Sequence, residues 1–114
     1  MKQNYLANIT LASSTNWTSN VTSDPYPLTQ FDKAGFVFSW TSLVGTLTTT
    51  SFDIEVSNDA TNWATQSSAV SVGTNATGVD AVSLTDLEFN YVRVKANIGS
   101  VTNGAFLVTA TLKR

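Results

Sequence analysis

The chain has 114 residues and a hydrophobic fraction of 42%, which suffices for one packed core and excludes a disordered chain. Its net charge is −2 and its six basic residues form no cluster, which argues against nucleic-acid binding, because a duplex binder needs several phosphate contacts from one basic face. The chain contains no Cys and no His, so disulfides, the usual zinc ligands and the commonest general base are excluded.

Charged residues make up only 12% of the chain, and Thr, Ser and Asn take their place. Thr favours strands through its branched Cβ, whereas Ser and Asn favour turns. No apolar run approaches the roughly 20 residues of a membrane span, and the N-terminal segment alternates like a strand instead of forming the continuous apolar stretch of a signal peptide. We therefore expect one all-β domain over residues 1–114, made in the cytoplasm and without membrane contact.

Alternation of apolar and polar residues with a period of two is the dominant pattern. Weaker segments with this pattern are 4–12, 17–22, 63–72 and 79–84, and stronger ones are 36–40, 52–57, 91–96 and 106–112. Clusters of turn-forming residues separate the segments, including a break at 23–27. Strands every 8–15 residues without a helical stripe predict an antiparallel β-sandwich, jelly-roll-like, with about eight strands.

Two groups of polar residues resemble functional sites, and each has an ordinary structural explanation. Asp53 and Glu55 share a strand face about 6–7 Å apart, a spacing that glycosidases use, but a solvated strand face accounts for them. Asn58, Asp59 and Asn62 precede Trp63 in an oxygen-rich turn that could hold calcium, yet their spacing does not match an EF-hand loop and such turns are common in hairpins. We predict no enzymatic activity, no metal and no cofactor.

The aromatic residues leave two interpretations open. Trp40 continues the Phe36–Phe38 face and is assigned to the core, and Trp63 is expected to pack under the turn before it. Trp17 and Tyr26 lie in the least regular region and are predicted to be exposed. Exposed aromatic side chains suit a protein–protein interface, where they are enriched, and they also suit stacking on sugar rings. The interface is the favoured interpretation, and carbohydrate binding is the alternative.

Two motifs carry a family resemblance. Residues 52–63 read Phe-Asp-Ile-Glu-Val-Ser-Asn-Asp-Ala-Thr-Asn-Trp, and residues 89–96 read Phe-Asn-Tyr-Val-Arg-Val-Lys-Ala. They resemble the strand–turn–Trp motif and the later Tyr-Val-Arg strand of discoidin-like (coagulation factor 5/8 C-type) sandwiches. With the closing strand 104–112 they cover about half of the chain. The chain is shorter than those domains and lacks their terminal cysteines and opening segment, so no ligand-binding residue is carried over.

The compact form of this pattern is similar to small virion proteins of tailed bacteriophages. In those proteins a comparable turn precedes a Tyr-Val-Arg-Val strand, a Gly-rich hairpin and a final strand near the C-terminus. Ala60 stands where they often have Gly. The resemblance implies a structural role in the phage particle, as a head decoration, a neck or tail component, or an appendage.

The resemblance also implies partners and a location. Capsid or tail proteins would be contacted through strand edges and loops, with Trp17, Tyr26, Lys113 and Arg114 as the interface candidates. Symmetric homo-oligomers are expected in such assemblies, and analogy suggests a trimer. The protein would be made in the host cytoplasm and located in the virion. The alternative is a carbohydrate- or receptor-binding module, with a glycan as its partner.

Overall fold

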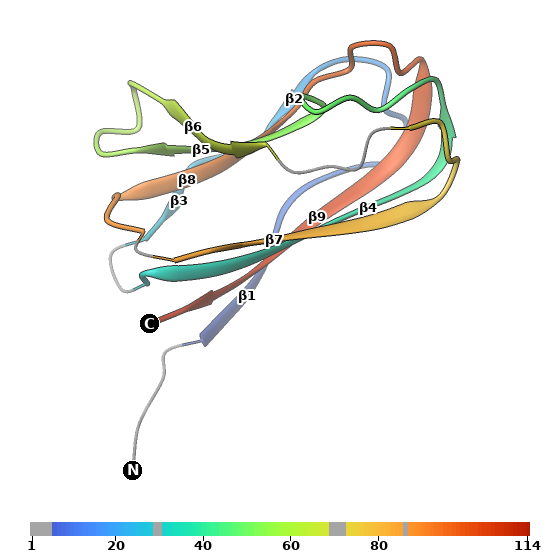
Figure 1. The fold of residues 1–114 in the computed structure, drawn as a ribbon. Coiled ribbons are helices and arrows are strands. Elements are labelled where there is room, and N and C mark those ends of the chain that lie inside the picture. Colours follow the sequence, from blue (N-terminus) through green and yellow to red (C-terminus); the bar gives the residue numbers. More distant parts are fainter. Residues whose placement is uncertain (1–5, 29–30, 69–72, 86) are drawn as a thin grey trace.

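The computed structural model describes residues 6–28, 31–68, 73–85 and 87–114 and consists of two antiparallel sheets packed face to face (Figure 1). Its strands are β1 (Leu6–Ser14), β2 (Val21–Thr22), β3 (Tyr26–Pro27), β4 (Lys33–Val44), β5 (Phe52–Ser57), β6 (Ala64–Ser68), β7 (Gly78–Leu84), β8 (Tyr91–Ala96) and β9 (Asn103–Lys113). Sheet 1 has the order β1-β9-β4-β7, and sheet 2 has the order β2-β8-β5-β6, with β3 also paired to β8. The described ranges contain no helix.

The strand order confirms the predicted antiparallel sandwich and shows its jelly-roll connectivity. If β2 and β3 are taken as one strand, the chain changes sheet at every connection except the β5–β6 hairpin. The first and last strands, β1 and β9, therefore become neighbours in sheet 1, with Ile9 opposite Ala110. Such an arrangement closes two Greek keys around one core.

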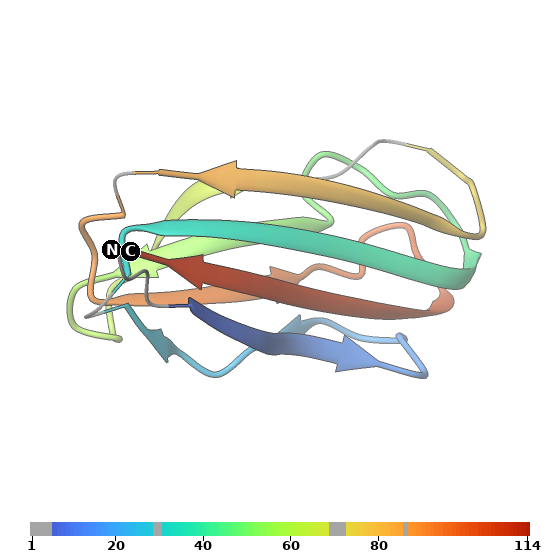
Figure 2. The ribbon, with the colours of Figure 1, turned by 90° about the horizontal axis from the view of Figure 1, so that it is seen from below.

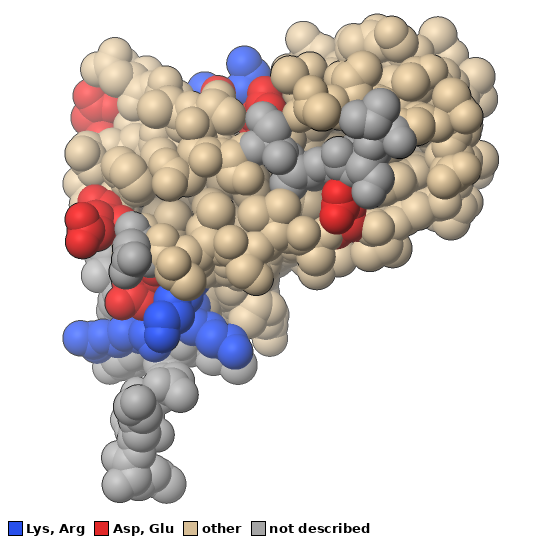
Figure 3. All heavy atoms as spheres, viewed as in Figure 1, with Lys and Arg blue, Asp and Glu red and all other residues tan. Residues whose placement is uncertain are grey.

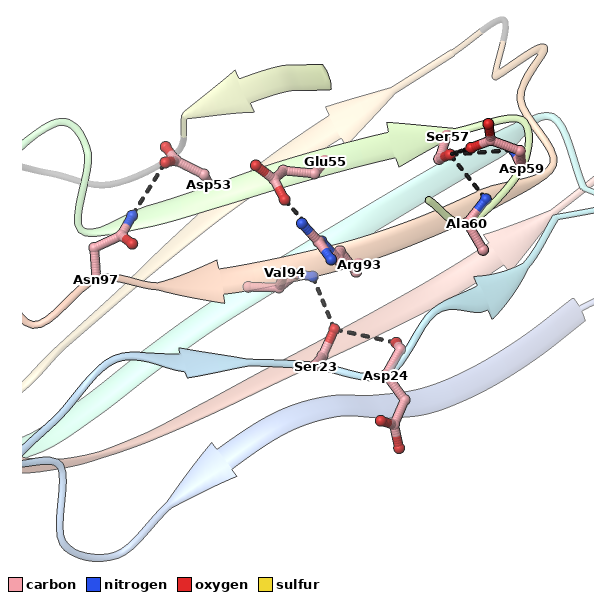
Figure 4. A network of polar contacts seen from close by, with 10 residues as sticks. All are labelled: Ser23, Asp24, Asp53, Glu55, Ser57, Asp59, Ala60, Arg93, Val94 and Asn97. Atoms are coloured by element: carbon pink, nitrogen blue, oxygen red, sulfur yellow. Dashed lines mark hydrogen bonds and ion pairs between the residues drawn. The ribbon is translucent and has the colours of Figure 1, made fainter. Parts of the chain in front are cut away.

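The expected number of about eight strands becomes nine because one strand is interrupted. β2 pairs with the end of β8 and β3 with its start, so both follow a single line along β8. Between them lies Pro25, which has no N–H to donate to a ladder. Ser23 maintains the pairing there: its amide donates to the carbonyl of Val94 (2.9 Å), and its hydroxyl accepts from the amide of Val94 (2.9 Å) (Figure 4).

Most of the predicted segments form strands with the expected face inward. Phe36, Phe38 and Trp40 are buried, and Phe52, Ile54 and Val56 meet them from sheet 2. Two predictions at 17–27 are wrong. The expected strand 17–22 is reduced to β2, and the expected break at 23–27 contains β3. Part of the predicted strand 63–72 lies outside the described residues, and the rest forms β6.

The prediction that Trp17 is exposed is also wrong. Its side chain is 0% exposed and lies between the sheets. Its ring stacks on Phe52 of sheet 2 at a centroid distance of 5.3 Å and meets the edge of Phe106 of sheet 1 at 4.9 Å. The amide of Trp17 donates to the carbonyl of Gly104 (2.8 Å), which fixes this connection against β9. Burying a large aromatic surface outweighs the local irregularity on which the prediction relied.

Trp40 is buried at the same end of the core, as predicted, and its position depends on a glycine. Its indole Nε1 donates to the carbonyl of Asn75 (3.1 Å), and Gly78 lies directly opposite it on the edge strand β7. A Cβ atom on Gly78 would come within 2.4 Å of the Trp40 ring. Gly78 therefore leaves the space that the indole fills.

We expect Gly78→Ala to lower the free energy of unfolding by about 1–3 kcal/mol, because the added methyl group forces the Trp40 ring out of its place. Gly35→Ala is the matched control. It lies in β4, nothing is within 4 Å of its Cβ position, and it should be neutral or stabilising by roughly 0.5–1 kcal/mol. Urea unfolding followed by tryptophan fluorescence measures both. Equal effects would show that Trp40 does not require the glycine.

Candidate functional site

The turn between β5 and β6 is organised by two side chains. The Ser57 hydroxyl accepts from the amides of Asp59 (3.2 Å) and Ala60 (2.9 Å) and donates to the Asp59 carboxylate (2.9 Å) (Figure 4). The carboxylate also accepts from the amides of Asn62 (2.8 Å) and Thr61 (2.9 Å) and from the Asn62 side-chain amide (2.9 Å). These donors, the amides of Asn62 and Thr61 foremost, hold the pKa of Asp59 well below its ordinary value.

The side chains of the predicted turn motif therefore bind the backbone amides of the same turn. The Asp59 carboxylate oxygens are occupied by N–H and O–H donors within the turn. The carbonyl of Asn58 accepts from the Asn90 side chain (2.9 Å), which ties the turn to the start of β8. Ala60 has a φ of 61°, in the left-handed region where glycine is favoured.

The outer face of sheet 2 carries paired opposite charges. Asp53 lies opposite Lys95, and Glu55 opposite Arg93, along the β5–β8 ladder. Arg93 Nε donates to Glu55 Oε1 at 2.7 Å (Figure 4). The guanidinium also lies 4.2 Å from the centroid of the Trp63 ring. The expectation of a solvated Asp53–Glu55 face is wrong for Glu55, which is only 8% exposed, because Arg93 covers it.

The tryptophans assemble no sugar-stacking platform within the described residues. Trp17 and Trp40 are buried. Trp63 is half-buried, and the Arg93 guanidinium occupies one face of its ring. Trp63 was expected to pack under the preceding turn, and its ring contacts the guanidinium of Arg93, which extends from β8. A guanidinium stacked on an indole is a favourable cation–π pair, which a sugar ring on that face would have to replace.

The structure does not bring the predicted interface residues together. Tyr26 is half-buried in β3, and Lys113 and Arg114 are exposed at the end of β9. Trp17 contacts the opposite end of that strand through Gly104. A strand of this length separates its two ends by about 30 Å. Lys113 instead lies directly opposite Lys33 of β4, so two like charges meet at this end of sheet 1.

Among the described strand residues, the outer face of sheet 1 carries no charge except Lys33 and Lys113 at one end. Figure 2 shows β1, β9, β4 and β7 side by side across it. Its central positions alternate with the buried ones and carry Ser, Thr, Ala, Gly and three exposed apolar side chains. Val79 is 68% exposed, Val37 42% and Leu107 41%. Exposed apolar side chains gathered on one face are typical of an interaction surface.

Shallow depressions lie on the same face. One is lined by residues of β1, β4 and β9 at the end near Trp40, including Ser13, Thr41 and Leu107. Another, of about 450 Å³, lies at the opposite end between Lys33 and Lys113. A third lies between Thr10 and Thr109. All three are open and lined by residues of sheet 1, so the outer face is uneven but has no enclosed pocket there.

The loops at one end continue this uncharged surface. In the view of Figure 3, the right-hand end shows no Lys, Arg, Asp or Glu side chain, whereas charged side chains lie at the left, at the top and near the centre. Sequence reasoning missed this face, although a signal was present. No charged residue occurs between Lys2 and Asp24, between Lys33 and Asp53, or between Lys95 and Lys113. Only the strand order shows that these three stretches supply β1, β4 and β9, which are neighbours in one sheet.

The described residues contain no group of three or more acidic side chains placed to hold a metal ion. No helix in the described ranges is long and apolar enough to cross a membrane.

We expect Ala60→Gly to stabilise the chain by about 0.5–1 kcal/mol, because an L-residue at this φ is strained and glycine is not. Ala64→Gly, the same substitution in the extended strand β6, should cost roughly 0.5–1 kcal/mol. Chemical denaturation of both variants beside the wild type measures the two values. If Ala60→Gly were as destabilising as Ala64→Gly, the turn would not be strained.

We expect Asp59→Asn to destabilise the chain at neutral pH, because the amide oxygen is a weaker acceptor for the turn amides than the carboxylate. The folded-state pKa is depressed below its ordinary value of 3.8, so the wild-type advantage is present above pH 4 and shrinks as the pH falls further. Urea unfolding at several pH values measures this, with exposed Asp24→Asn as the control. A difference that is constant down to low pH would contradict the assignment.

Comparisons with known proteins show the fold that this chain shares. No family model matches the chain, so the discoidin-like assignment stays a prediction, and no curated protein matches its sequence. Its structure is similar to the SPBc2 prophage-derived protein YomS, with a TM-score of 0.69 at 11% identity over 100% of this chain and 97% of YomS.

A second similar structure is the PBSX exported protein XepA, with a TM-score of 0.65 at 15% identity. The match covers 93% of this chain but only 36% of XepA, so the chain spans a minor part of that protein. A chain of the cyanophage Pam1 capsid asymmetric unit aligns with a TM-score of only 0.43 at 16% identity, over 97% of this chain and 83% of that one. The chain thus shares its β-sandwich fold with the prophage-derived protein YomS and with part of the exported protein XepA.

Proposed function

We propose that this chain is a structural component of a bacteriophage particle, a head decoration, neck, tail or appendage protein, and that it acts by protein–protein packing without catalysis. One observation carries the proposal: the two outer faces of the sandwich differ in charge. Sheet 2 carries opposite charges across the β5–β8 ladder, with Glu55 covered by Arg93. The centre of the sheet 1 face carries hydroxyls and the exposed Val37, Val79 and Leu107 instead. Depletion of charge and exposure of apolar side chains mark the central part of a protein interface.

The structural likenesses support the same role. YomS is prophage-derived, and it matches this chain over nearly its full length. The partners would be capsid or tail proteins, and the protein would be made in the host cytoplasm before it enters the virion. The uncharged loop end would be the natural contact for a lattice, because its loops are held by backbone hydrogen bonds such as that from the Thr102 amide to the Val44 carbonyl (2.9 Å).

The carboxylates give no support to glycosidase chemistry. Glu55 is bound to Arg93 at 2.7 Å, and Asp53 accepts from the Asn97 side chain at 3.1 Å. A retaining or inverting pair needs one carboxyl group that gives up a proton and one that attacks or activates water. Glu55 is committed to a guanidinium and covered by it, which disfavours both roles.

We expect the protein to band with phage particles in a density gradient when its gene is expressed from its own genome. Mass spectrometry of the particle band should find it in many copies, comparable to other structural proteins, because packing roles are repeated by symmetry. An abundant host cytoplasmic protein serves as the contamination control. Recovery only from the particle-free fraction would overturn the proposal, and binding of the isolated protein to a glycan array would favour the carbohydrate-binding alternative instead.

A further inference from the structure

We infer that the outer face of sheet 1 binds the same face of a second copy of this chain, so that two sandwiches stack about a two-fold axis. The inference deepens the proposed structural role, on which it rests for its biological meaning, by naming the surface and the partner. Three features carry it: the strand edges, the area of the face and the distribution of charge.

The strand edges disfavour contact through added strands. β1 has a register shift between Thr10 and Ala12, and the β5–β6 ladder has one between Ile54 and Glu55. On the other edges, Pro25 interrupts the β2–β3 line, and β7 places Asp80 opposite the inward-facing Phe38. Bulges, prolines and inward-pointing charges are devices that prevent edge-to-edge pairing. The expectation that strand edges dock on a partner is therefore replaced by contact through a face.

The area of the face matches the need of a stable dimer. β4 has 12 residues, β9 has 11, β1 has 9 and β7 has 7. Strands about 4.8 Å apart with a rise of about 3.3 Å per residue give the face on the order of 600 Å². Two such faces bury roughly 1,200 Å² together, which reaches the range of specific interfaces. Packing of sheets face to face about 10 Å apart is the ordinary way in which such surfaces meet.

The charge distribution favours a second copy as the partner. In a two-fold contact each residue near the axis meets its own equivalent, so a charge near the centre of the face would oppose itself. The centre of this face carries Val37 and its cross-strand neighbours Ala81 and Thr109, which are uncharged. Sheet 2 would place Arg93 and Glu55 at the corresponding position. A face that meets itself gives a two-fold pair, so this surface builds a dimer and not the trimer that analogy suggested.

The lysines at one end set the orientation of the pair. Lys33 and Lys113 face each other across β4 and β9 at the end of the sheet. An axis along the strands would bring two lysine pairs together, whereas an axis across the strands exchanges the ends. In the second arrangement each lysine pair lies over the partner's uncharged end, near Thr41. Like-charge repulsion selects this arrangement, in which the strands of the two copies run in opposite directions.

The test is the molar mass of the full chain by light scattering on a size-exclusion column, with matched variants. Wild type should be a dimer. Thr109→Asp places two carboxylates at the centre of the contact and should raise the dissociation constant by roughly a hundredfold or more, giving a monomer. Thr22→Asp is the control, because Thr22 is an exposed strand residue of sheet 2 opposite Lys95, and it should remain a dimer.

A charge-reversal mixture separates lost binding from lost folding. Thr109→Lys alone should also be monomeric, and an equimolar mixture with Thr109→Asp should recover a dimer, because opposite charges then meet near the axis. Far-ultraviolet circular dichroism checks that each variant is folded. A monomeric wild type, or an unchanged mass for folded Thr109→Asp, would overturn the inference.

Thiol cross-linking with a short bifunctional maleimide tests the orientation, because the chain has no cysteine of its own and sheets about 10 Å apart are too far for a direct disulfide. Gly35 and Ser39 lie on the outer face of β4, two residues to either side of Val37. A mixture of Gly35→Cys and Ser39→Cys chains should form cross-linked mixed dimers, and each variant alone should form few. Efficient cross-linking of Gly35→Cys with itself would show the other orientation and overturn this part of the inference.

The two proposals fail in different ways. Particle banding tests the structural role without reference to the dimer, and light scattering tests the dimer without any particle. The Thr109→Asp variant can be used in both experiments. If it is a folded monomer and still bands with particles, the structural role stands and the dimer is not needed for incorporation.

Discussion

The stacking of Trp17 between the two sheets is the contact on which the rest of the sandwich depends. Its ring meets Phe52 of sheet 2 and Phe106 of sheet 1, and Phe52 in turn lies 5.3 Å from Phe38. The indole N–H has no hydrogen-bond partner among the described residues, which costs on the order of 1–3 kcal/mol. Burial of the whole ring system and two aromatic contacts outweigh that loss. The open end of the sandwich is thus closed by a connection, which leaves both outer faces free for other purposes.

The outward positions of the alternating strands form both outer faces, but the side chains at these positions differ in charge between the two sheets. On sheet 2, outward positions hold opposite charges that face each other across the β5–β8 ladder, and Arg93 pairs with Glu55 there. On sheet 1, outward positions hold small, branched and hydroxyl-bearing side chains, whose desolvation costs less than that of charged groups. This division requires no special residue, only the placement of three charge-free stretches in adjacent strands.

Much of the fold could be predicted from period-two alternation. In a strand with one buried face, the alternation of apolar and polar residues in the local sequence shows which side chains point inward. Phe36, Phe38 and Trp40 show this, and all are buried as expected. Trp17 shows the limit. Nothing in its neighbours indicates burial, since its partners Phe52 and Phe106 are far away in the chain and are brought to it only by the strand order. The uncharged face was missed for the same reason, whereas the turn 57–63 was found because its hydrogen bonds are local.

The protected strand edges limit the ways in which copies of this chain can associate. A chain that pairs through its edges offers a fresh edge with every addition, so growth into fibres has no natural end. A face that pairs with an identical face is used up by a single contact and offers no second one. With β1, the β2–β3 line, β6 and β7 all interrupted or protected, the described edges favour closed association over open-ended fibre growth.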